Sequence, residues 1–268
     1  MIHIKGKVAL ITGGSSGIGA GTAKVLASEG YDIAITYSKN LEGALSTAKY
    51  IRESYNVKCL VIQADMEKRE SAQYIVNKTT DHFSRLDLLV NNAGSGIYKN
   101  IKDFNDDEIE YLINLNFRGY YLTSKAAAKY MIENNIKGSI ICISSSRAER
   151  AYSGDSVYGG MKAALNRSIQ SIALDLAPYG IRVNCISPGA IRVRNDEKTI
   201  DFYKELGARI PLGREGLPQD IGNAVAFMAS DKASYITGIS LRIDGGLILP
   251  GMPETRRDPF FVNWYEEP

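Results

Sequence analysis

Short apolar runs rich in β-branched residues alternate with longer stretches of helical period along most of the chain. The runs are apolar almost throughout, which predicts strands covered on both faces. Strands are expected at Val8–Thr12, Ile33–Tyr37, Cys59–Gln63, Leu86–Asn91, Ser139–Ser144, Arg182–Ser187 and Ser240–Asp244. Helices are expected at Ile18–Glu29, Leu41–Tyr55, Arg69–Phe83, Asp106–Asn134, Ser156–Ala177 and Gln219–Ser230. The pattern predicts a doubly wound α/β fold with a parallel sheet between two helix layers.

Three segments fall outside this alternation, namely Ser95–Phe104, Gly189–Leu217 and Met252–Pro268. Neither a repeat nor a linker divides the chain, so residues 1–251 are expected to form one domain. Long connections in compact domains are usually functional, and we therefore interpret residues 189–217 as a substrate lid. Residues 252–268 hold the only tryptophan, and an exposed aromatic tail is an aggregation liability. We expect the tail to dock over its own crevice or on a neighbouring subunit.

Composition narrows the classes of function. The 268 residues carry 32 Lys+Arg and 30 Asp+Glu, a net charge of +2, without the basic excess of nucleic-acid-binding domains. No apolar run approaches the roughly 18 residues that cross a bilayer, and the N-terminus lacks a secretory signal, so a cytoplasmic protein is expected. Cys59, Cys142 and Cys185 lie in separate apolar runs, which favours buried thiols. With only His3 and His82, neither a metal cluster nor a Ser/His/Asp mechanism is expected.

A glycine-rich turn joins the first predicted strand to the first predicted helix. It reads Thr12-Gly13-Gly14-Ser15-Ser16-Gly17-Ile18-Gly19. Glycine permits a tight turn and close approach of the backbone to a pyrophosphate, and the helix start supplies N–H groups and a positive dipole end. The turn predicts a dinucleotide site, although such a pattern alone is weak evidence.

A second motif, Tyr158-Gly159-Gly160-Met161-Lys162, opens a long predicted helix. A separation of four places the phenol and the ammonium on one helix face, one turn apart. An ammonium about 4 Å from a phenol would lower the phenol pKa by roughly three units at an effective dielectric of ~20. The spacing therefore predicts a tyrosine that exchanges a proton near neutral pH.

Together with Asn91-Asn92-Ala93-Gly94, Ser145 ahead of Tyr158, and Ser187-Pro188-Gly189, these motifs resemble the short-chain dehydrogenase/reductase family in its compact single-domain form. The resemblance extends to about Gly246 and is nearest to bacterial glucose 1-dehydrogenases, 3-oxoacyl-carrier-protein reductases and hydroxysteroid dehydrogenases. It implies a single Rossmann domain with a seven-stranded parallel sheet.

The resemblance also implies four catalytic residues. Ser145 would orient the substrate and Tyr158 would transfer the proton, while Lys162 would hold the cofactor ribose and lower the Tyr158 pKa. The backbone carbonyl of Asn116 would hold a water on the proton path of Lys162. By chemistry alone, Ser144 and Ser146 remain alternatives to Ser145.

The cofactor-binding residues that follow from the turn and the resemblance surround one crevice. Asp65 would meet the adenine amine, and the Asn91 segment would line the adenosine side. The full set is Gly13, Ser15, Ser16, Gly17, Ile18, Gly19, Tyr37, Ser38, Lys39, Asp65, Met66, Asn91, Ala93, Gly94, Tyr158, Lys162, Pro188, Gly189 and Ile191. The family often has a threonine where this chain has Val193, which puts one hydrogen bond to the nicotinamide carboxamide in doubt.

The end of the second predicted strand bears on the choice between NAD(H) and NADP(H). NAD enzymes of this shape usually carry an acid there, which binds the ribose hydroxyls. This chain has Tyr37 at that place, followed by Ser38 and Lys39. Without a carboxylate to repel a 2′-phosphate, and with Lys39 nearby, NADP(H) is predicted over NAD(H).

The expected activity is hydride transfer between NADP(H) and a secondary alcohol or ketone, either a sugar such as glucose or a hydroxysteroid or bile acid. Two alternatives stay open: a 3-oxoacyl thioester reductase, and a non-catalytic NADP(H)-sensing protein. Arg192, Arg194 and Lys198 of the expected lid would either meet an anionic group or stay solvated. The resemblance implies a homotetramer assembled through the long helices.

Overall fold

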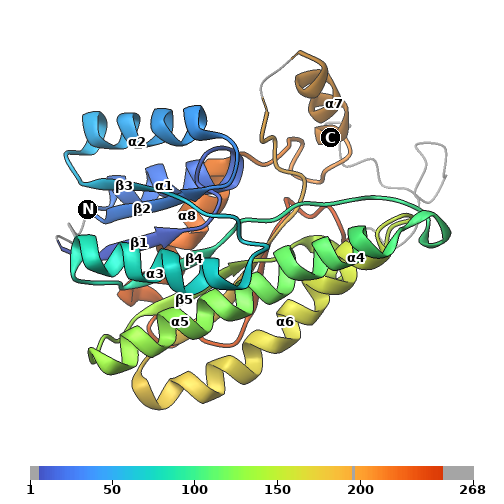
Figure 1. Cartoon of the computed structure of the whole chain (residues 1–268). Coiled ribbons are helices and arrows are strands. Elements are labelled where there is room, and N and C mark those ends of the chain that lie inside the picture. The colour runs from blue at the N-terminus through green and yellow to red at the C-terminus, as the bar shows by residue number, and fades with distance from the viewer. Residues whose placement is uncertain (1–5, 195–196, 250–268) are drawn as a thin grey trace.

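The computed structural model describes residues 6–194 and 197–249, and its centre is one parallel sheet (Figure 1). The sheet has seven strands in the order β3-β2-β1-β4-β5-β6-β7, and every neighbouring pair is parallel. The strands are β1 (Val8–Ile11), β2 (Asp32–Tyr37), β3 (Cys59–Gln63), β4 (Leu88–Asn91), β5 (Ser139–Ile143), β6 (Arg182–Pro188) and β7 (Ser240–Ile243). The predicted Rossmann sheet is confirmed, with strand ends that shift by one or two residues.

Two helix layers cover the sheet. One layer contains α1 (Gly17–Ser28), α2 (Leu41–Tyr55) and α8 (Pro218–Ala229), and the other contains α3 (Arg69–Phe83), α5 (Gly119–Glu133) and α6 (Ser156–Leu176) (Figure 1). Alternate residues of β1 divide between the two cores, since Ala9 and Ile11 face the first and Leu10 faces the second. This division explains why the strands are apolar at consecutive positions.

One predicted helix is interrupted. Residues 106–134 were expected to form a single helix, whereas the structure has α4 (Asp106–Ile113), a π-helical turn (Asn114–Arg118) and then α5. The turn is fixed by the amide of Asn116, which donates to the carbonyls of Ser95 (2.9 Å) and Leu112 (3.1 Å). One extra residue in a turn leaves the apolar period on each side intact, so the sequence pattern does not show the interruption.

Residues 189–217 contain a helix that the sequence analysis did not predict, α7 (Glu197–Gly207). The two ends of this segment meet in an isolated bridge between Ile191 and Gly216. Arg192 pairs with Glu215 at 3.1 Å, so its charge is compensated within the segment. That the segment is a substrate lid stays a prediction.

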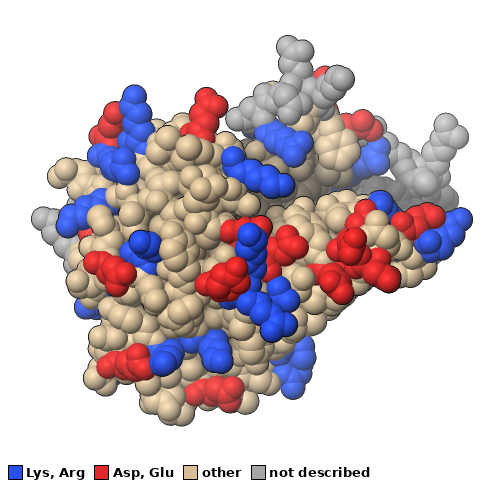
Figure 2. Space-filling view, in the orientation of Figure 1, with Lys and Arg blue, Asp and Glu red and all other residues tan. Residues whose placement is uncertain are grey.

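Several expectations from composition can be compared with the structure. The three cysteines are buried free thiols, as predicted. None of the described helices combines the length and apolar character needed to cross a membrane. Lys and Arg are interleaved with Asp and Glu on the face shown in Figure 2, where acids gather over α4. His3 and the aromatic tail at 252–268 lie outside the described residues.

Candidate active site

The predicted site residues come together at one edge of the sheet. Parallel strands end at the same edge, and the strand order reverses between β1 and β4, which is where ligands of such sheets bind. The glycine turn follows β1, Ser38 follows β2 and Asp65 follows β3. The Asn91 segment, Ser145 and Gly189 come at or directly after the ends of β4, β5 and β6. Topology thus brings six distant segments to one edge.

The glycine turn is shaped for close approach. Gly13 and Gly17 have φ of +69° and +53°, a region that L side chains rarely adopt. A Cβ on Gly19 would lie 2.2 Å from the Gly13 carbonyl oxygen, and one on Gly14 would lie 2.6 Å from the Ile35 side chain. The N-terminus of α1, whose first N–H groups have no partner within the helix, follows the turn directly. This cradle fits a dinucleotide pyrophosphate.

Two residues that the sequence analysis did not single out fasten the turn to β4. The hydroxyl of Thr12 accepts from the backbone N–H groups of Asn92 (2.8 Å) and Ala93 (2.9 Å). The amide of Asn92 donates to the carbonyls of Thr12 (2.8 Å) and Gly13 (3.2 Å). The Asn91-Asn92-Ala93-Gly94 motif therefore has a structural task in addition to lining the crevice.

Asn91 itself points away from the crevice. Its side chain is buried and donates to the Ser124 hydroxyl (2.9 Å) and the Tyr120 carbonyl (3.3 Å). The amide N–H groups of Asn91 are thus used in the core, which leaves its backbone to line a ligand. Gly94, in contrast, lies tightly against Asn116, because a Cβ on Gly94 would come within 2.7 Å of Oδ1.

The predicted adenosine side begins at the end of β2. Tyr37 is buried in the core, whereas Ser38 and Lys39 are exposed. The first turn of α2 lies against the glycine turn, since a Cβ on Gly43 would be 2.4 Å from the Ser15 carbonyl oxygen. The start of α2, which follows Lys39 in the chain, therefore borders the cradle. Met66, after β3, is buried and Asp65 is partly exposed.

The far wall of the crevice is formed after β6. Gly189 lies directly against Asp244, because a Cβ there would come within 2.6 Å of the Asp244 side chain. Beyond it the chain turns back over the glycine turn, where a Cβ on Gly17 would lie 3.2 Å from the side chain of Val193. Pro188 and Ile191 are buried. The two halves of the predicted cofactor site thus face each other.

Tyr158 and Ser145 meet as the sequence predicts. Ser145 is the neighbouring side chain that lowers the pKa of Tyr158 by hydrogen bonding, while Ser144 instead donates to the Lys162 carbonyl at 3.2 Å. The geometry therefore favours Ser145 over Ser144 as the partner of the phenol. Ser145 is held in place by the Arg147 N–H, which donates to its hydroxyl at 3.2 Å.

The expectation that Lys162 lowers the pKa of Tyr158 does not match the structure. Burial raises the pKa of Tyr158 to about 12, with a smaller contribution from Tyr98, and only the Ser145 hydrogen bond and Arg147 oppose this rise. The Lys162 ammonium lies 5.6 Å from the Tyr158 ring centroid. The spacing of two residues in a helix fixes the positions of their Cβ atoms. It does not fix the position of the ammonium at the end of the lysine side chain, nor how strongly burial desolvates the phenol.

The Lys162 ammonium instead has two partners beneath the site. It donates to the Ile143 carbonyl at 2.8 Å and to the Tyr120 hydroxyl at 3.4 Å. It also lies 4.7 Å from the centroid of the Tyr120 ring. Because Lys162 is buried, desolvation lowers its pKa to about 8. Tyr120, which follows Asn116 by one helical turn, was missed by the sequence analysis; only its spacing from Asn116 could have indicated it.

A further group of side chains borders Tyr158. The ring of Tyr98 meets the ring of Tyr158 edge-on, with centroids 5.9 Å apart. The Arg147 guanidinium lies 4.9 Å from the Tyr98 ring centroid and pairs with the buried Asp155 at 3.1 Å. No sequence motif indicates this group, because its members come together only through the loops after β4 and β5.

A glycine cradle at the switch point of a parallel sheet, with a serine, a tyrosine and a buried lysine at the same edge, defines the class: an oxidoreductase that uses a nicotinamide dinucleotide. A family model described as "Enoyl-(Acyl carrier protein) reductase" matches residues 13–248. The chain belongs to the short-chain dehydrogenase/reductase family and acts on alcohol or ketone groups with NAD(H) or NADP(H).

Relatives of the chain carry different substrate names. Glucose 1-dehydrogenase 2 of Bacillus subtilis is 32% identical over 92% of this chain and 96% of its own. 3beta-Hydroxysteroid dehydrogenase 1 of Eggerthella lenta is 33% identical over 92% of this chain and 96% of its own. A short-chain dehydrogenase from Burkholderia cenocepacia, solved in complex with NADP, is 34% identical with a TM-score of 0.83, over 91% of this chain and 99% of its own.

Proposed function

We propose that the chain transfers a hydride between NADP(H) and a secondary alcohol or ketone, with Tyr158 as the proton donor and acceptor. The observation that carries this proposal is the convergence of Ser145, which follows β5, with Tyr158 and the buried Lys162 of α6 at the carboxyl edge of the sheet. A nucleotide-sensing protein without catalysis would have no use for this arrangement.

In the reductive direction the substrate carbonyl oxygen would lie between the two hydroxyls. NADPH, when bound, supplies the hydride that the carbonyl carbon accepts. Ser145 would hold the oxygen by a hydrogen bond, and Tyr158 would give its phenolic proton to that oxygen as negative charge develops there. Lys162 would hold the cofactor ribose, with Asn116 and its π turn completing the proton path to solvent. In the oxidative direction the same groups act in reverse.

Replacing Tyr158 with Phe tests the catalytic assignment, because it removes only the proton-bearing oxygen. Turnover should fall by at least about a thousandfold, within the range of a lost general acid, while NADP binding measured by calorimetry persists. Tyr74→Phe, on an exposed tyrosine of α3, is the matched control and should leave turnover unchanged. Substantial turnover in the Tyr158 variant would refute the assignment.

The preference for NADP(H) over NAD(H) is proposed from the end of β2. Lys39 is exposed two residues after β2, and Tyr37 stands where NAD enzymes of this shape usually carry an acid, so no carboxylate there repels a 2′-phosphate. Lys39→Ala should reduce kcat/KM for NADP about tenfold, the size of one charge-assisted hydrogen bond, and leave that for NAD unchanged. Lys58→Ala, an exposed lysine at the opposite end of the strand layer, is the control. A tenfold preference of the native chain for NAD would overturn the proposal.

Two substrate classes are supported by the names of relatives, sugars and hydroxysteroids. A 3-oxoacyl thioester reductase is the second candidate function. The description of the family model, an enoyl-(acyl carrier protein) reductase, supports only the thioester part of this candidate, because enoyl reduction acts on a carbon–carbon double bond. A panel of aldoses, ketosteroids including bile-acid ketones, and short β-keto thioesters, read at about 340 nm (the absorbance of the reduced nicotinamide) in both directions, distinguishes them. Absence of turnover across the whole panel would support the sensing protein instead.

A further inference from the structure

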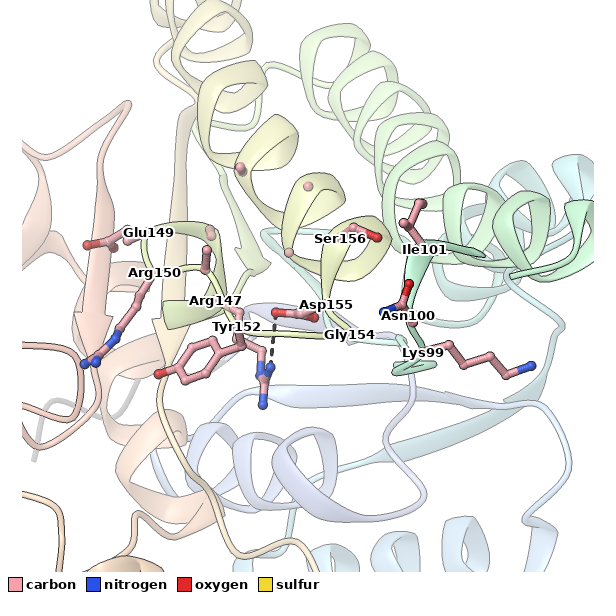
Figure 3. Close-up of a pocket in the computed structure, with 15 residues that line it drawn as sticks. Lys99, Asn100, Ile101, Arg147, Glu149, Arg150, Tyr152, Gly154, Asp155 and Ser156 are labelled. Carbon is pink, nitrogen blue, oxygen red and sulfur yellow. Dashed lines mark ion pairs between the residues drawn. The ribbon is translucent and has the colours of Figure 1, made fainter. Parts of the chain in front are cut away.

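A cavity of about 560 Å³ lies at the N-terminal end of α6, the helix that carries Tyr158 (Figure 3). Its walls are the loop of residues 147–152, the residues that open α6, and Lys99–Ile101 of the loop after β4. Gly159, next to Tyr158 in the chain, is one of the lining residues. The volume is in the range of small-molecule sites.

The most unusual group in this wall is the carboxylate of Asp155. Its side chain is only 2% exposed, yet neither carboxylate oxygen accepts a hydrogen bond from any residue in the described part of the chain. Asp155 occupies the N-cap position of α6 without making the usual cap bond. Its one partner is the ion pair from Oδ2 to Arg147, drawn as the dashed line in Figure 3. A buried carboxylate with so few donors is costly, so further donors are expected from a ligand.

The Arg147 guanidinium lies beside the Asp155 carboxylate and can donate hydrogen bonds to a ligand. Its guanidinium lies 4.5 Å from the Tyr152 ring centroid and 4.9 Å from that of Tyr98. The two rings hold it in place, and Tyr98 in turn meets the ring of Tyr158. Only one of its terminal nitrogens pairs with Asp155, while guanidinium has five N–H groups. The wall of the cavity thus presents the Arg147 donors and the Asp155 acceptor side by side. The Tyr98 ring lies between Arg147 and the phenol of Tyr158 and contacts both.

Four of the five charged residues that line the cavity have ion-pair partners. Lys99 pairs with Glu108, Glu149 with Arg242 and Arg147 with Asp155, while the Arg150 guanidinium lies 5.8 Å from the centroid of the Tyr152 ring. Asp155 repels an anion and Arg147 repels a cation. A neutral group that both donates and accepts hydrogen bonds matches this pair, and a hydroxyl is such a group.

We propose that this cavity is a subsite for a polyhydroxylated neutral substrate, a sugar or polyol. Asp155 accepts hydrogen bonds from neighbouring hydroxyls, Arg147 donates to their oxygens, and the Tyr152 ring packs against the carbon skeleton. The inference rests on the proposed function, since it requires the reacting carbon to lie at Tyr158. It favours sugars over hydroxysteroids and acyl thioesters, which do not offer several hydroxyl donors on neighbouring carbons to the carboxylate.

The test compares variants on two kinds of substrate. Asp155→Asn keeps the shape of the side chain and removes the charged acceptor. Its kcat/KM for glucose and xylitol should fall about tenfold, the size of a lost charge-assisted hydrogen bond, chiefly through KM. Its kcat/KM for cyclohexanone, which has no hydroxyl to bind, should change less than about threefold on the same grounds. Glu53→Gln is the matched control, because this exposed carboxylate of α2 pairs with Lys49 and does not line the cavity, and it should behave as the native chain on both substrates.

Distinct outcomes separate the two proposals. If the native chain reduces cyclohexanone but neither oxidises nor binds glucose or xylitol, by calorimetry in the presence of NADP, the subsite is refuted and the proposed function stands. Equal losses on both substrates in Asp155→Asn would show a merely structural role and also refute it. If Tyr158→Phe keeps full turnover, the proposed function fails, whereas calorimetric binding of xylitol that Asp155→Asn abolishes would still support the subsite.

Discussion

At the scale of single residues, the site depends on burial more than on spacing. Tyr158 and Lys162 are four positions apart, a spacing that predicts both side chains on the same face of the helix. The structure places both in α6 with this spacing. The predicted pKa of the phenol was nevertheless wrong in direction, since burial raises the pKa of Tyr158 to about 12. Burial is a property of the whole fold and cannot be read from two residues.

Lys162→Met tests the burial of the lysine through the dependence of stability on pH. The pKa of Lys162 is lowered from 10.5 to about 8 in the folded chain. Between these values the unfolded chain binds more protons than the folded one, so stability rises with pH. The native chain should therefore gain up to about 3 kcal/mol of unfolding free energy relative to the Met variant as pH rises from 8 to above 10. Below pH 8 the cost of burying the charge is fully present and the difference should be flat.

Denaturant unfolding of both chains at several pH values gives this difference directly. Other groups that titrate in the same range, such as tyrosines, are shared by both chains and cancel. A difference between the two chains that does not vary across pH 8 to 10 would mean that the folded pKa of Lys162 is ordinary.

Tyr120→Phe tests the second phenol beneath the site. The Tyr120 hydroxyl accepts from Lys162 and donates to the Ile143 carbonyl, which also accepts from Lys162. Removing only this oxygen should cost about 1 kcal/mol of stability, because one buried hydrogen-bonded network loses a member. It should also shift the pH profile of kcat, since Lys162 loses a partner. Tyr121→Phe, on the exposed neighbour, is the control, and equal behaviour of the two variants would deny Tyr120 this role.

At the scale of elements, the periodicity of apolar residues predicts which segments form strands and which form helices. All seven strands and both helix layers follow from apolar runs and helical spacing. The π turn and α7 do not, for different physical reasons. The π turn depends on the amide of Asn116 bonding to the distant Ser95 backbone, a tertiary contact. Helix α7 lies in a segment whose Gly, Pro and Arg residues are typical of loops, and its flanking contacts, such as Ile191 with Gly216, are again tertiary.

Gly19→Ala tests the glycine turn as an element. A methyl at this position would overlap the Gly13 carbonyl at 2.2 Å and the Asn92 amide at 2.6 Å, and backbone cannot move aside as a flexible side chain can. The turn would have to open, which displaces the N–H groups meant for the pyrophosphate. NADP affinity measured by calorimetry should fall at least about tenfold, as expected for losing one charge-assisted hydrogen bond.

Gly160→Ala is the matched control for this variant. A Cβ there meets nothing within 4 Å, and the position is in α6. NADP affinity should stay unchanged, and the variant should gain about 0.5–1 kcal/mol of stability because alanine favours the helix. Unchanged affinity in Gly19→Ala would mean that the turn does not hold the pyrophosphate.

At the scale of the whole molecule, topology assembles the site. The strand order places the ends of β1, β4, β5 and β6 side by side, which is why motifs spread over residues 12–189 converge. The sequence motifs therefore predicted the glycine turn, Ser145, Tyr158 and Lys162 as neighbours of one edge. They could not predict Tyr98, Arg147 and Asp155 as a group, because loops of irregular path bring these side chains together.

Assembly is the property of the whole molecule that remains to be tested, and we expect a homotetramer formed through the long helices. In the helix layer formed by α3, α5 and α6, Leu174 of α6 is 77% exposed and Tyr121 of α5 is 47% exposed. Burying such side chains between copies of the chain would release water from apolar surface. Light scattering coupled to gel filtration should give a mass four times that of the 29.4 kDa chain.

Leu174→Glu should lower this mass, because a charge would be buried at the contact between copies. Leu45→Glu, on an exposed leucine of α2 in the opposite layer, should leave the mass unchanged, and a native chain that elutes as a monomer would contradict the expectation.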